Sequence, residues 1–368
     1  MNKTWIGIIS LTLLLMACSQ EAGQGAIKIG SILALTGDAA AIGQSMQRGI
    51  QVALDEINAQ DGINGRPLEI IFEDGHCSGK DASNAANKLV NMDKVPAIIG
   101  GLCSPETLGA APIAEVGKAV LLSPTSSNPG ITNAGNYIFR DYPSDLFQGQ
   151  FAAEYVYNQL GKKKAAILYC LNDWCTGLKD QFSERFKELG GEVVAVQEYE
   201  VDSKDLRTQL TKIKENDPEI LYFLGLTDGS VVGLIQVKEL ALNIPLLGGD
   251  GWSDPDIPRK AKDAAENMMW TEPYAPISDA FKSKITAKFG QVDITLGTTQ
   301  AYDATYLIAN ALKKVGPNGT KIKEELYKVK NYKGVSGTIG FDENGDLIEA
   351  SYIVKTLKNG KVEDHYKP

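Results

Sequence analysis

Two hydrophobic periodicities alternate along the chain. Short runs of β-branched and apolar residues are typical of buried strands, and longer runs with apolar residues every three or four positions are typical of amphipathic helices. In residues 42–58, for example, Met46, Ile50, Leu54 and Ile57 fall on one helical face. The first series comprises strands at 27–33, 68–72, 97–99 and 119–122 and helices at 42–58, 82–92 and 106–116.

The same rhythm starts again after residue 147, which predicts a second unit of the same kind. Alternation of strands and helices implies mostly parallel sheets with helices on both faces, so the predicted fold class is α/β with two doubly wound lobes. No residue-level repeat links the two series. The second series comprises helices at 148–160, 178–189, 205–216 and 230–240 and strands at 165–169, 192–199, 220–224 and 245–247.

The order changes after residue 268. Helices at 279–289, 299–314 and 321–329 are followed by strand-like runs around the turn at 342–346, Asp-Glu-Asn-Gly-Asp. The turn has the composition of a calcium loop, but its glycine is the fourth residue, whereas an EF-hand needs glycine at the sixth. The pattern therefore favours a hairpin turn.

The first residues of the chain indicate export. Residues 5–16 form an apolar run of 12 residues, which is shorter than the roughly 20 that span a bilayer as a helix. We interpret residues 1–17 as a signal peptide. The run ends in Leu-Met-Ala-Cys, which resembles a bacterial lipobox with Cys18 as the lipid attachment site and residues 18–26 as the tether. The alternative is a chance cysteine behind an ordinary signal peptide.

Length and charge limit the classes of function. The 368 residues exceed the roughly 250–300 at which one core tends to split, so two lobes are expected. A net charge of −9 argues against nucleic acid as a partner, because phosphates require a face of lysine and arginine. The sequence contains no nucleophile-elbow, P-loop or dinucleotide-binding motif, and nothing in it predicts a cofactor, a metal or catalysis.

Four cysteines remain once Cys18 is assigned to lipid. In an exported chain an even number of cysteines is typical of disulfides, and three connectivities are possible for four. Cys77 and Cys103 follow neighbouring strands, whose ends bring Cα atoms within reach of a disulfide. We therefore predict one disulfide between Cys77 and Cys103 and a local one between Cys170 and Cys175. Metal ligation is the alternative, which the two histidines and the lack of a Cys-x-x-Cys pair make weak.

Polar loops follow two strand ends of the first lobe, where open α/β sheets bind ligands. Ser104 fits a helix N-cap and Pro105 the first helical position, so this helix start offers free N–H groups to a carboxylate. The loop at 123–129, Ser-Pro-Thr-Ser-Ser-Asn-Pro, is able to donate to an anion through hydroxyls and backbone N–H groups. The alternatives are that Ser104 only caps its helix and that the loop is an ordinary solvated turn.

Two strand-end loops of the second lobe carry an acid and large aromatic rings. Trp174 follows the strand at 165–169, and Asp250 and Trp252 lie in the glycine-rich loop behind the strand at 245–247. An aspartate among glycines is able to face a ligand ammonium without crowding, and the tryptophans offer apolar surface. Taken singly, such an aspartate is usually a turn former and such a tryptophan usually belongs to a core.

At these loops the sequence resembles the branched-chain amino acid-binding protein family, the type I periplasmic binding proteins that serve ABC importers. The resemblance is carried, in the family's order, by I-K-I-G-S-I-L-A-L-T-G-D, A-L-D-E-I-N-A-Q-D-G-I-N-G-R-P-L, I-I-G-G-L-C-S, L-L-S-P-T-S-S-N-P and G-F-D-E-N-G-D. It implies a ligand cleft between two lobes joined by three crossovers, near residues 142–146, 272–274 and 337–340. The implied lobes are 27–143 plus 273–338 and 144–272 plus 339–368.

The resemblance also implies roles for individual residues. Ser104 contacts the ligand carboxylate, Asp250 meets the ammonium, and Trp174 covers the ligand. The loop at 123–129 supplies a backbone carbonyl and a hydroxyl, and Ile42 stands where an aromatic residue lines the family's pocket. The predicted ligand-binding residues are Ser104, Ser126, Ser127, Asp250, Trp174, Leu102, Ile42 and Thr227.

The sequence therefore predicts an exported solute-binding lipoprotein on a bacterial membrane, facing the periplasm or the cell exterior. It would hand a small uncharged or hydrophobic amino acid to the membrane subunits of an ABC importer, without enzymatic activity. One alternative is the same fold binding an amide, an aromatic acid or a short peptide. The other is a sensory module that reports ligand binding to a partner protein.

Overall fold

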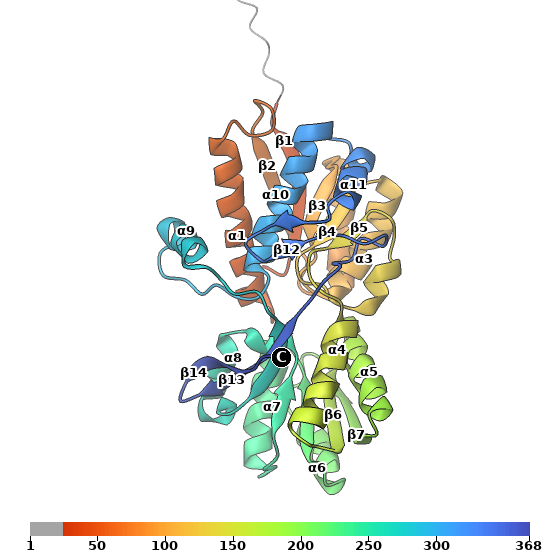
Figure 1. Ribbon diagram of the computed structural model, residues 1–368, viewed down its shortest axis with the longest axis vertical. Coiled ribbons are helices and arrows are strands. Elements are labelled where there is room, and N and C mark those ends of the chain that lie inside the picture. The colour runs from red at the N-terminus through yellow and green to blue at the C-terminus, as the bar shows by residue number, and fades with distance from the viewer. Residues whose placement is uncertain (1–24) are drawn as a thin grey trace, which may run out of the picture.

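The computed structural model describes residues 25–368, so the predicted signal peptide and Cys18 lie outside the described residues. The chain forms two lobes that are stacked along the long axis of the molecule, each with its own sheet and its own helices (Figure 1). The predicted α/β fold with two lobes built on parallel sheets is confirmed. Within residues 25–368, none of the helices has both the length and the apolar character needed to cross a membrane.

The first lobe contains a five-stranded sheet in the order β2-β1-β3-β4-β5, in which all pairs are parallel. Helices α1 and α10 cover one face, where Ile29 and Ile308 are buried, and α2 and α3 cover the other, where Ile98 and Leu121 are buried. Burial on both faces explains why its strands are almost continuously apolar. The elements of this lobe are β1 (Ile27–Leu33), α1 (Ala40–Ala59), β2 (Leu68–Asp74), α2 (Gly79–Asn87), η1 (Lys88–Met92), β3 (Ala97–Gly100), α3 (Ser104–Gly117), β4 (Val120–Ser123), η2 (Pro129–Asn133), β5 (Ile138–Arg140), α9 (Asp279–Phe289), α10 (Thr298–Val315), α11 (Gly319–Tyr327), β11 (Tyr332–Lys333) and β12 (Thr338–Ile339).

The second lobe contains a seven-stranded sheet in the order β14-β13-β10-β9-β8-β6-β7. Its last two strands in sequence, β13 and β14, join antiparallel at one edge, while the other pairs are parallel. The elements of this lobe are α4 (Asp145–Glu154), η3 (Tyr155–Gln159), β6 (Lys164–Cys170), α5 (Asp173–Glu188), β7 (Glu192–Tyr199), α6 (Arg207–Glu215), β8 (Ile220–Leu224), α7 (Thr227–Glu239), β9 (Leu246–Gly248), η4 (Asp250–Ser253), α8 (Asp256–Ala261), η5 (Lys262–Ala265), β10 (Met269–Pro273), β13 (Tyr352–Lys358) and β14 (Lys361–Tyr366).

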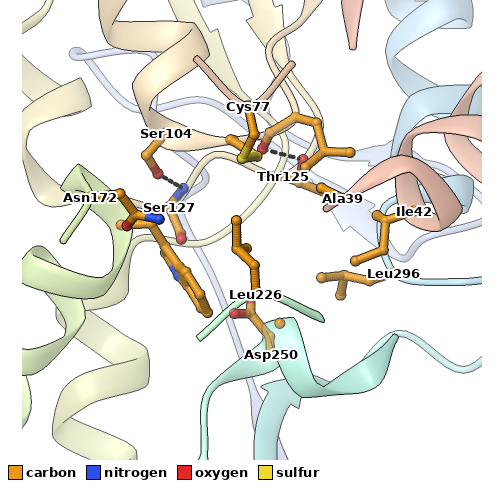
Figure 2. Close-up of a pocket in the computed structure, with 14 residues that line it drawn as sticks. Ala39, Ile42, Cys77, Ser104, Thr125, Ser127, Asn172, Leu226, Asp250 and Leu296 are labelled. Carbon is orange, nitrogen blue, oxygen red and sulfur yellow. Dashed lines mark hydrogen bonds between the residues drawn. A yellow bond between two sulfur atoms is a disulfide. The ribbon is translucent and has the colours of Figure 1, made fainter. Parts of the chain in front are cut away.

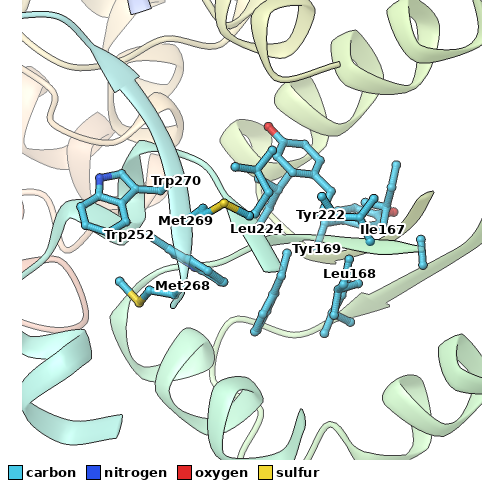
Figure 3. Close-up of a cluster of buried hydrophobic side chains, with 14 of the residues drawn as sticks. Ile167, Leu168, Tyr169, Tyr222, Leu224, Trp252, Met268, Met269 and Trp270 are labelled. Carbon is cyan, nitrogen blue, oxygen red and sulfur yellow. The ribbon is translucent and has the colours of Figure 1, made fainter. Parts of the chain in front are cut away.

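Aromatic side chains fill the core of the second lobe on both sides of β8 (Figure 3). Tyr222 stacks on Phe182 of α5, with ring centroids 4.3 Å apart. The next residue, Phe223, points to the opposite face and meets the edge of Trp252 at 5.4 Å, as the two-residue period of a strand requires. Trp252 is 1% exposed and belongs to this core rather than to a ligand surface.

Three segments join the lobes, at residues 141–144, 274–278 and 348–351. The sequence assigned residues 339–347 to the second lobe, whereas the structure packs this segment on the first. Phe341 meets the Phe139 ring at 5.3 Å, and Asp346 pairs with the buried Arg140 at 2.6 Å. The hairpin turn at 342–346 is confirmed by the bridge between Phe341 and Leu347. The third crossover therefore lies after this turn, about ten residues later than predicted.

The predicted helices and strands match the structure closely elsewhere, but the short helix α8 was not predicted. Neither β5 nor β10 was predicted, and both lie beside a crossover. β10 pairs in parallel with β9 on one side and antiparallel with β13 on the other. Both strands place residues at the hinge between the lobes, next to the site described below.

Candidate functional site

A cleft lies between the lobes (Figure 2), and the empty space in it, together with the open solvent at its mouth, amounts to about 480 Å³. Loops at the carboxyl ends of β1, β3, β4, β6 and β9 supply much of its lining, which is where open α/β sheets place their ligands. The first lobe contributes Ala39, Ile42, Cys77, Leu102, Cys103, Ser104, Thr125, Ser127 and Leu296, and the second contributes Asn172, Trp174, Leu226, Asp250 and Gly251.

Six of the eight predicted ligand-binding residues line this cleft, and Ser126 and Thr227 do not. The Ser126 hydroxyl lies 2.7 Å from that of Thr107 and donates to the carbonyl of Gly101, so it is used inside the first lobe. The Thr227 hydroxyl donates to a carboxylate oxygen of Asp254 at 2.5 Å. Both side chains are buried and point into their own lobes.

Ser104 does not cap its helix, contrary to the sequence prediction. Helix α3 starts at Ser104 and Cys103 is its N-cap residue. The Glu106 carboxylate accepts the N–H groups of Leu102 and Cys103 at 2.8 and 2.9 Å, so it takes the capping role. The Ser104 hydroxyl instead accepts the N–H groups of Ser127 and of the next residue at 3.3 and 3.1 Å. Ser104 thereby fastens the loop after β4 to the start of α3.

The hydroxyls of Thr125, which lines the cleft, and of Ser123, which lies behind it, are also hydrogen-bonded within the first lobe. Thr125 donates to the carbonyl of Leu102 at 2.8 Å. Ser123 donates to the carbonyl of Gly101 at 2.8 Å and accepts the N–H of Ser126 at 2.9 Å. These bonds hold the two strand-end loops of this wall in one arrangement.

Both predicted disulfides are present. Cys77 and Cys103 join the ends of β2 and β3, with Cα atoms 5.2 Å apart, and both cysteines line the cleft. Cys170 and Cys175, with Cα atoms 5.7 Å apart, bracket the loop that carries Trp174. Each disulfide thus fixes one wall of the cleft.

Asp250 is the one charged residue among those that line the cleft. It begins the short turn η4 behind β9 and is 3% exposed. Burial raises the pKa of Asp250 to about 6, while the hydroxyl of Tyr142, which donates to Oδ2 at 2.5 Å, opposes the rise and the charge of Glu272 adds to it. Burial also raises the pKa of the neighbouring Asp145 well above its ordinary value, and the charge of Asp250 contributes. A carboxylate in these surroundings is short of positive partners.

Trp174 and several aliphatic side chains give the cleft its apolar surface. Figure 2 shows Ile42 and Leu296 on one side of the cleft and Leu226 directed between Ser127 and Asp250. A Cβ atom on Gly251 would lie 2.7 Å from Cη2 of Trp174, so glycine lets the Asp250 loop lie directly against the ring.

Sequence reasoning missed several residues of the wall, for different reasons. Thr125 and Asn172 lie in strand-end loops that the sequence singled out, and Asn172 is also the N-cap of α5. Leu226 directly precedes the predicted residue Thr227 but was not itself predicted. Leu296 comes from the segment before α10, far along the chain, and no local pattern marks it. Among residues 25–368, no three histidine, cysteine, aspartate or glutamate side chains converge on a possible metal position.

Comparison with known proteins gives consistent matches over nearly the whole chain. The sequence profile of the periplasmic binding proteins matches residues 26–361. A leucine-, isoleucine-, valine-, threonine- and alanine-binding protein of Pseudomonas aeruginosa is 29% identical over 337 residues, which is 89% of each chain. Among solved structures, a leucine-binding protein of Thermotoga maritima is 30% identical, with a TM-score of 0.85 over 93% of this chain and 98% of its own. The substrate-binding protein of a branched-chain amino acid transporter of Streptococcus pneumoniae, solved in complex with isoleucine, is also 30% identical, with a TM-score of 0.84 over 93% and 100%.

Proposed function

The chain belongs to the periplasmic binding protein family, within its branched-chain amino acid-binding group, and from this premise we propose that it captures an uncharged, apolar α-amino acid and delivers it to an ABC importer. The protein is thus a solute-binding protein that acts outside the cytoplasm. We assign it no catalytic activity, in keeping with a family of substrate-binding proteins.

One observation carries the proposal: a buried carboxylate in the second lobe lies opposite a first-lobe wall that bears hydroxyl groups. Asp250 faces the cleft from the second lobe, and Ser104 and Ser127 face it from the first. A zwitterion placed between them would give its ammonium to Asp250 and its carboxylate to the first-lobe loops. Charge-assisted hydrogen bonds of this kind contribute roughly 1.5–3 kcal/mol each.

The rest of the wall supports an apolar ligand side chain. Ile42, Leu226 and Leu296 offer only aliphatic surface, and a second ionic group on the ligand would find no charged partner among the residues that line the cleft. The relatives named above are described as binding leucine, isoleucine, valine, threonine and alanine. These ligands share the features that the wall accommodates.

Isothermal titration of the purified, ligand-stripped protein against the twenty amino acids tests the proposal. We expect leucine, isoleucine or valine to bind most tightly and charged amino acids to bind least. Benzoate and 4-hydroxybenzoate, which lack an ammonium, serve as the contrasting set. Binding of these aromatic acids in preference to every amino acid would overturn the assignment.

The lipid anchor is the second part of the proposal. It rests on the Leu-Met-Ala-Cys motif at residues 15–18, which lies outside the described residues. Cys18→Ser should give an unprocessed or freely released protein that no longer incorporates a labelled fatty acid. Unchanged membrane retention of the variant, with no label in the unaltered protein, would contradict lipidation at Cys18.

A further inference from the structure

One hydrogen bond joins the two lobes at a place outside the residues that line the cleft. Asp38 lies in the loop between β1 and α1 of the first lobe, next to the cleft residue Ala39. Its Oδ1 accepts the N–H of Asp228 at 2.6 Å, in the first turn of α7 in the second lobe. Because the two residues belong to different lobes, this bond exists only while the lobes are closed together.

The surroundings of Asp38 oppose its negative charge. The other carboxylate oxygen, Oδ2, is buried and has no hydrogen-bond partner within the described residues. The charged and titratable groups that face it are Asp228 on α7, Asp254 behind η4, Lys260 on α8 and Tyr199 on β7. Two of these are like charges, and the single lysine is shared, since Lys260 contacts Asp228 at 3.3 Å.

We propose that Asp38 is a latch across the cleft mouth, a positioning residue that sets how fully the lobes close and thereby sets ligand affinity without touching the ligand. The proposal rests on the proposed function in one respect, namely that closure accompanies ligand binding. A ligand that binds the closed state gains or loses affinity with the free energy of closure. The hydrogen bond to α7 favours closure, and the burial of charge beside Asp228 and Asp254 opposes it.

Protonation of Asp38 removes the buried negative charge that opposes closure. It keeps a carboxyl oxygen that accepts the N–H of Asp228. Burial raises the pKa of Asp38 to about 6 in the closed state. In an open state the loop would face water, where an aspartate has a pKa near 4. The closed state then binds a proton more readily than the open one. The contribution of Asp38 to closure is therefore largest below about pH 4 and is lost as the pH rises through about 6.

Two substitutions separate the hydrogen bond from the charge. Asp38→Ala removes both, and it should open the lobes and weaken L-leucine binding about 3- to 10-fold at pH 5, with a smaller loss at pH 7.5, where the buried charge offsets the hydrogen bond. Asp38→Asn keeps an acceptor and removes the charge. It should bind L-leucine about 3- to 10-fold more tightly than the unaltered protein at pH 7.5, and this ratio should fall at pH 5 and approach one near pH 4.

The control breaks another contact that crosses the cleft. Arg259 of α8 pairs with Asp293 of the first lobe at 2.6 Å, but about half of each side chain is exposed. Such pairs contribute little, so Arg259→Ala should change affinity less than twofold at either pH. The ratio of Asp38→Asn to unaltered affinity also cancels the titration of Asp250, which both proteins share.

Lobe closure is measured directly in the same variants, without reference to any ligand. Spin labels at Val116→Cys and Val196→Cys, on exposed positions of the first and second lobes, report the distance between the lobes. We expect a longer mean distance in Asp38→Ala than in Asp38→Asn. Equal distances in the two variants, or an affinity ratio that is the same at pH 5 and pH 7.5, would overturn the latch. Lack of L-leucine binding with the expected distances would instead overturn the proposed ligand.

Discussion

The two walls of the cleft differ in how their polar groups are satisfied. In the first lobe, Ser104, Ser123 and Thr125 hydrogen-bond to the backbone of neighbouring loops. In the second lobe, Asp250 is a buried carboxylate that accepts a hydrogen bond from the Tyr142 hydroxyl, and Asp145 and Glu272 lie near it. The first wall is complete by itself, whereas the second lacks positive charge. We infer that the first wall orients a ligand and the second supplies most of the selectivity for an ammonium.

Removal of the disulfides should have the largest effect, which is on the free energy of unfolding. Because each disulfide belongs to one wall, the two removals test the walls separately. The Cys77–Cys103 bond spans 26 positions and the Cys170–Cys175 bond spans five. In the loop-entropy account they add about 3.5 and about 2 kcal/mol to the free energy of unfolding. Chemical denaturation of the two double Cys→Ala variants should show this order, since the longer loop restricts the unfolded chain more.

We expect the opposite order when the ligand affinities of the two double variants are compared. The first-lobe loops retain their hydrogen bonds without the Cys77–Cys103 bond. Without the Cys170–Cys175 bond, the loop that carries Trp174 is no longer held at both ends. Titration with L-leucine should therefore show the greater loss for the Cys170 and Cys175 variant. A greater loss for the Cys77 and Cys103 variant would show that the first wall is not complete by itself.

Asp250→Asn should have the next largest effect, which is on ligand affinity, and it tests the second wall. The substitution keeps the size of the side chain and removes its charge, so an amino acid ligand should bind about 10- to 100-fold more weakly. A ligand without an amine should change little. The control is Asp303→Asn, since Asp303 is 1% exposed but lies outside the cleft and should affect stability alone. Unaltered amino acid affinity in Asp250→Asn would mean that another acid holds the ammonium.

The pH dependence of the Asp250 contribution follows from its raised pKa. Without ligand the carboxylate has a pKa of about 6, and a bound ammonium would lower that value. The contribution of Asp250 is therefore present above about pH 6 and is lost as the pH falls below it. The ratio of unaltered to Asp250→Asn affinity should shrink toward one between pH 7 and pH 5. A constant ratio would contradict the raised pKa.

Trp174→Ala should have a smaller and less selective effect. The ring lies against Gly251 and lines the cleft, so its loss removes apolar contact for any ligand, with or without an amine. We expect about a 10-fold weaker affinity, as for other buried aromatic contacts. Trp174→Phe should recover part of it. A loss confined to amino acids would instead make Trp174 part of the ammonium site.

Most of the fold could be predicted from sequence because the hydrophobic pattern that marks a strand or a helix is local and spans only a few residues. β5 was missed since it is only three residues long, and the turn at 342–346 was assigned to the wrong lobe because Asp346 is held by Arg140, 206 positions earlier. The strand-end rule located most of the site, including Asp250. It did not locate Tyr142, which reaches Asp250 from a crossover between the lobes, or Leu296, which enters the first-lobe wall from the segment before α10.

Ser127→Ala should have the smallest effect and completes the comparison of the walls. The Ser127 backbone is held at both ends, since its N–H donates to Ser104 and its carbonyl accepts the N–H of Asp145 at 2.7 Å. Removing the hydroxyl therefore leaves the loop in place and deletes one neutral donor, which corresponds to about a 2- to 5-fold weaker affinity. Ser83→Ala is the matched control, because its hydroxyl donates to the carbonyl of Gly109 away from the cleft, and it should change stability but not affinity. If Ser127→Ala cost as much as Asp250→Asn, the first wall would carry as much of the binding free energy as the second, and the division of roles between the two lobes would be wrong.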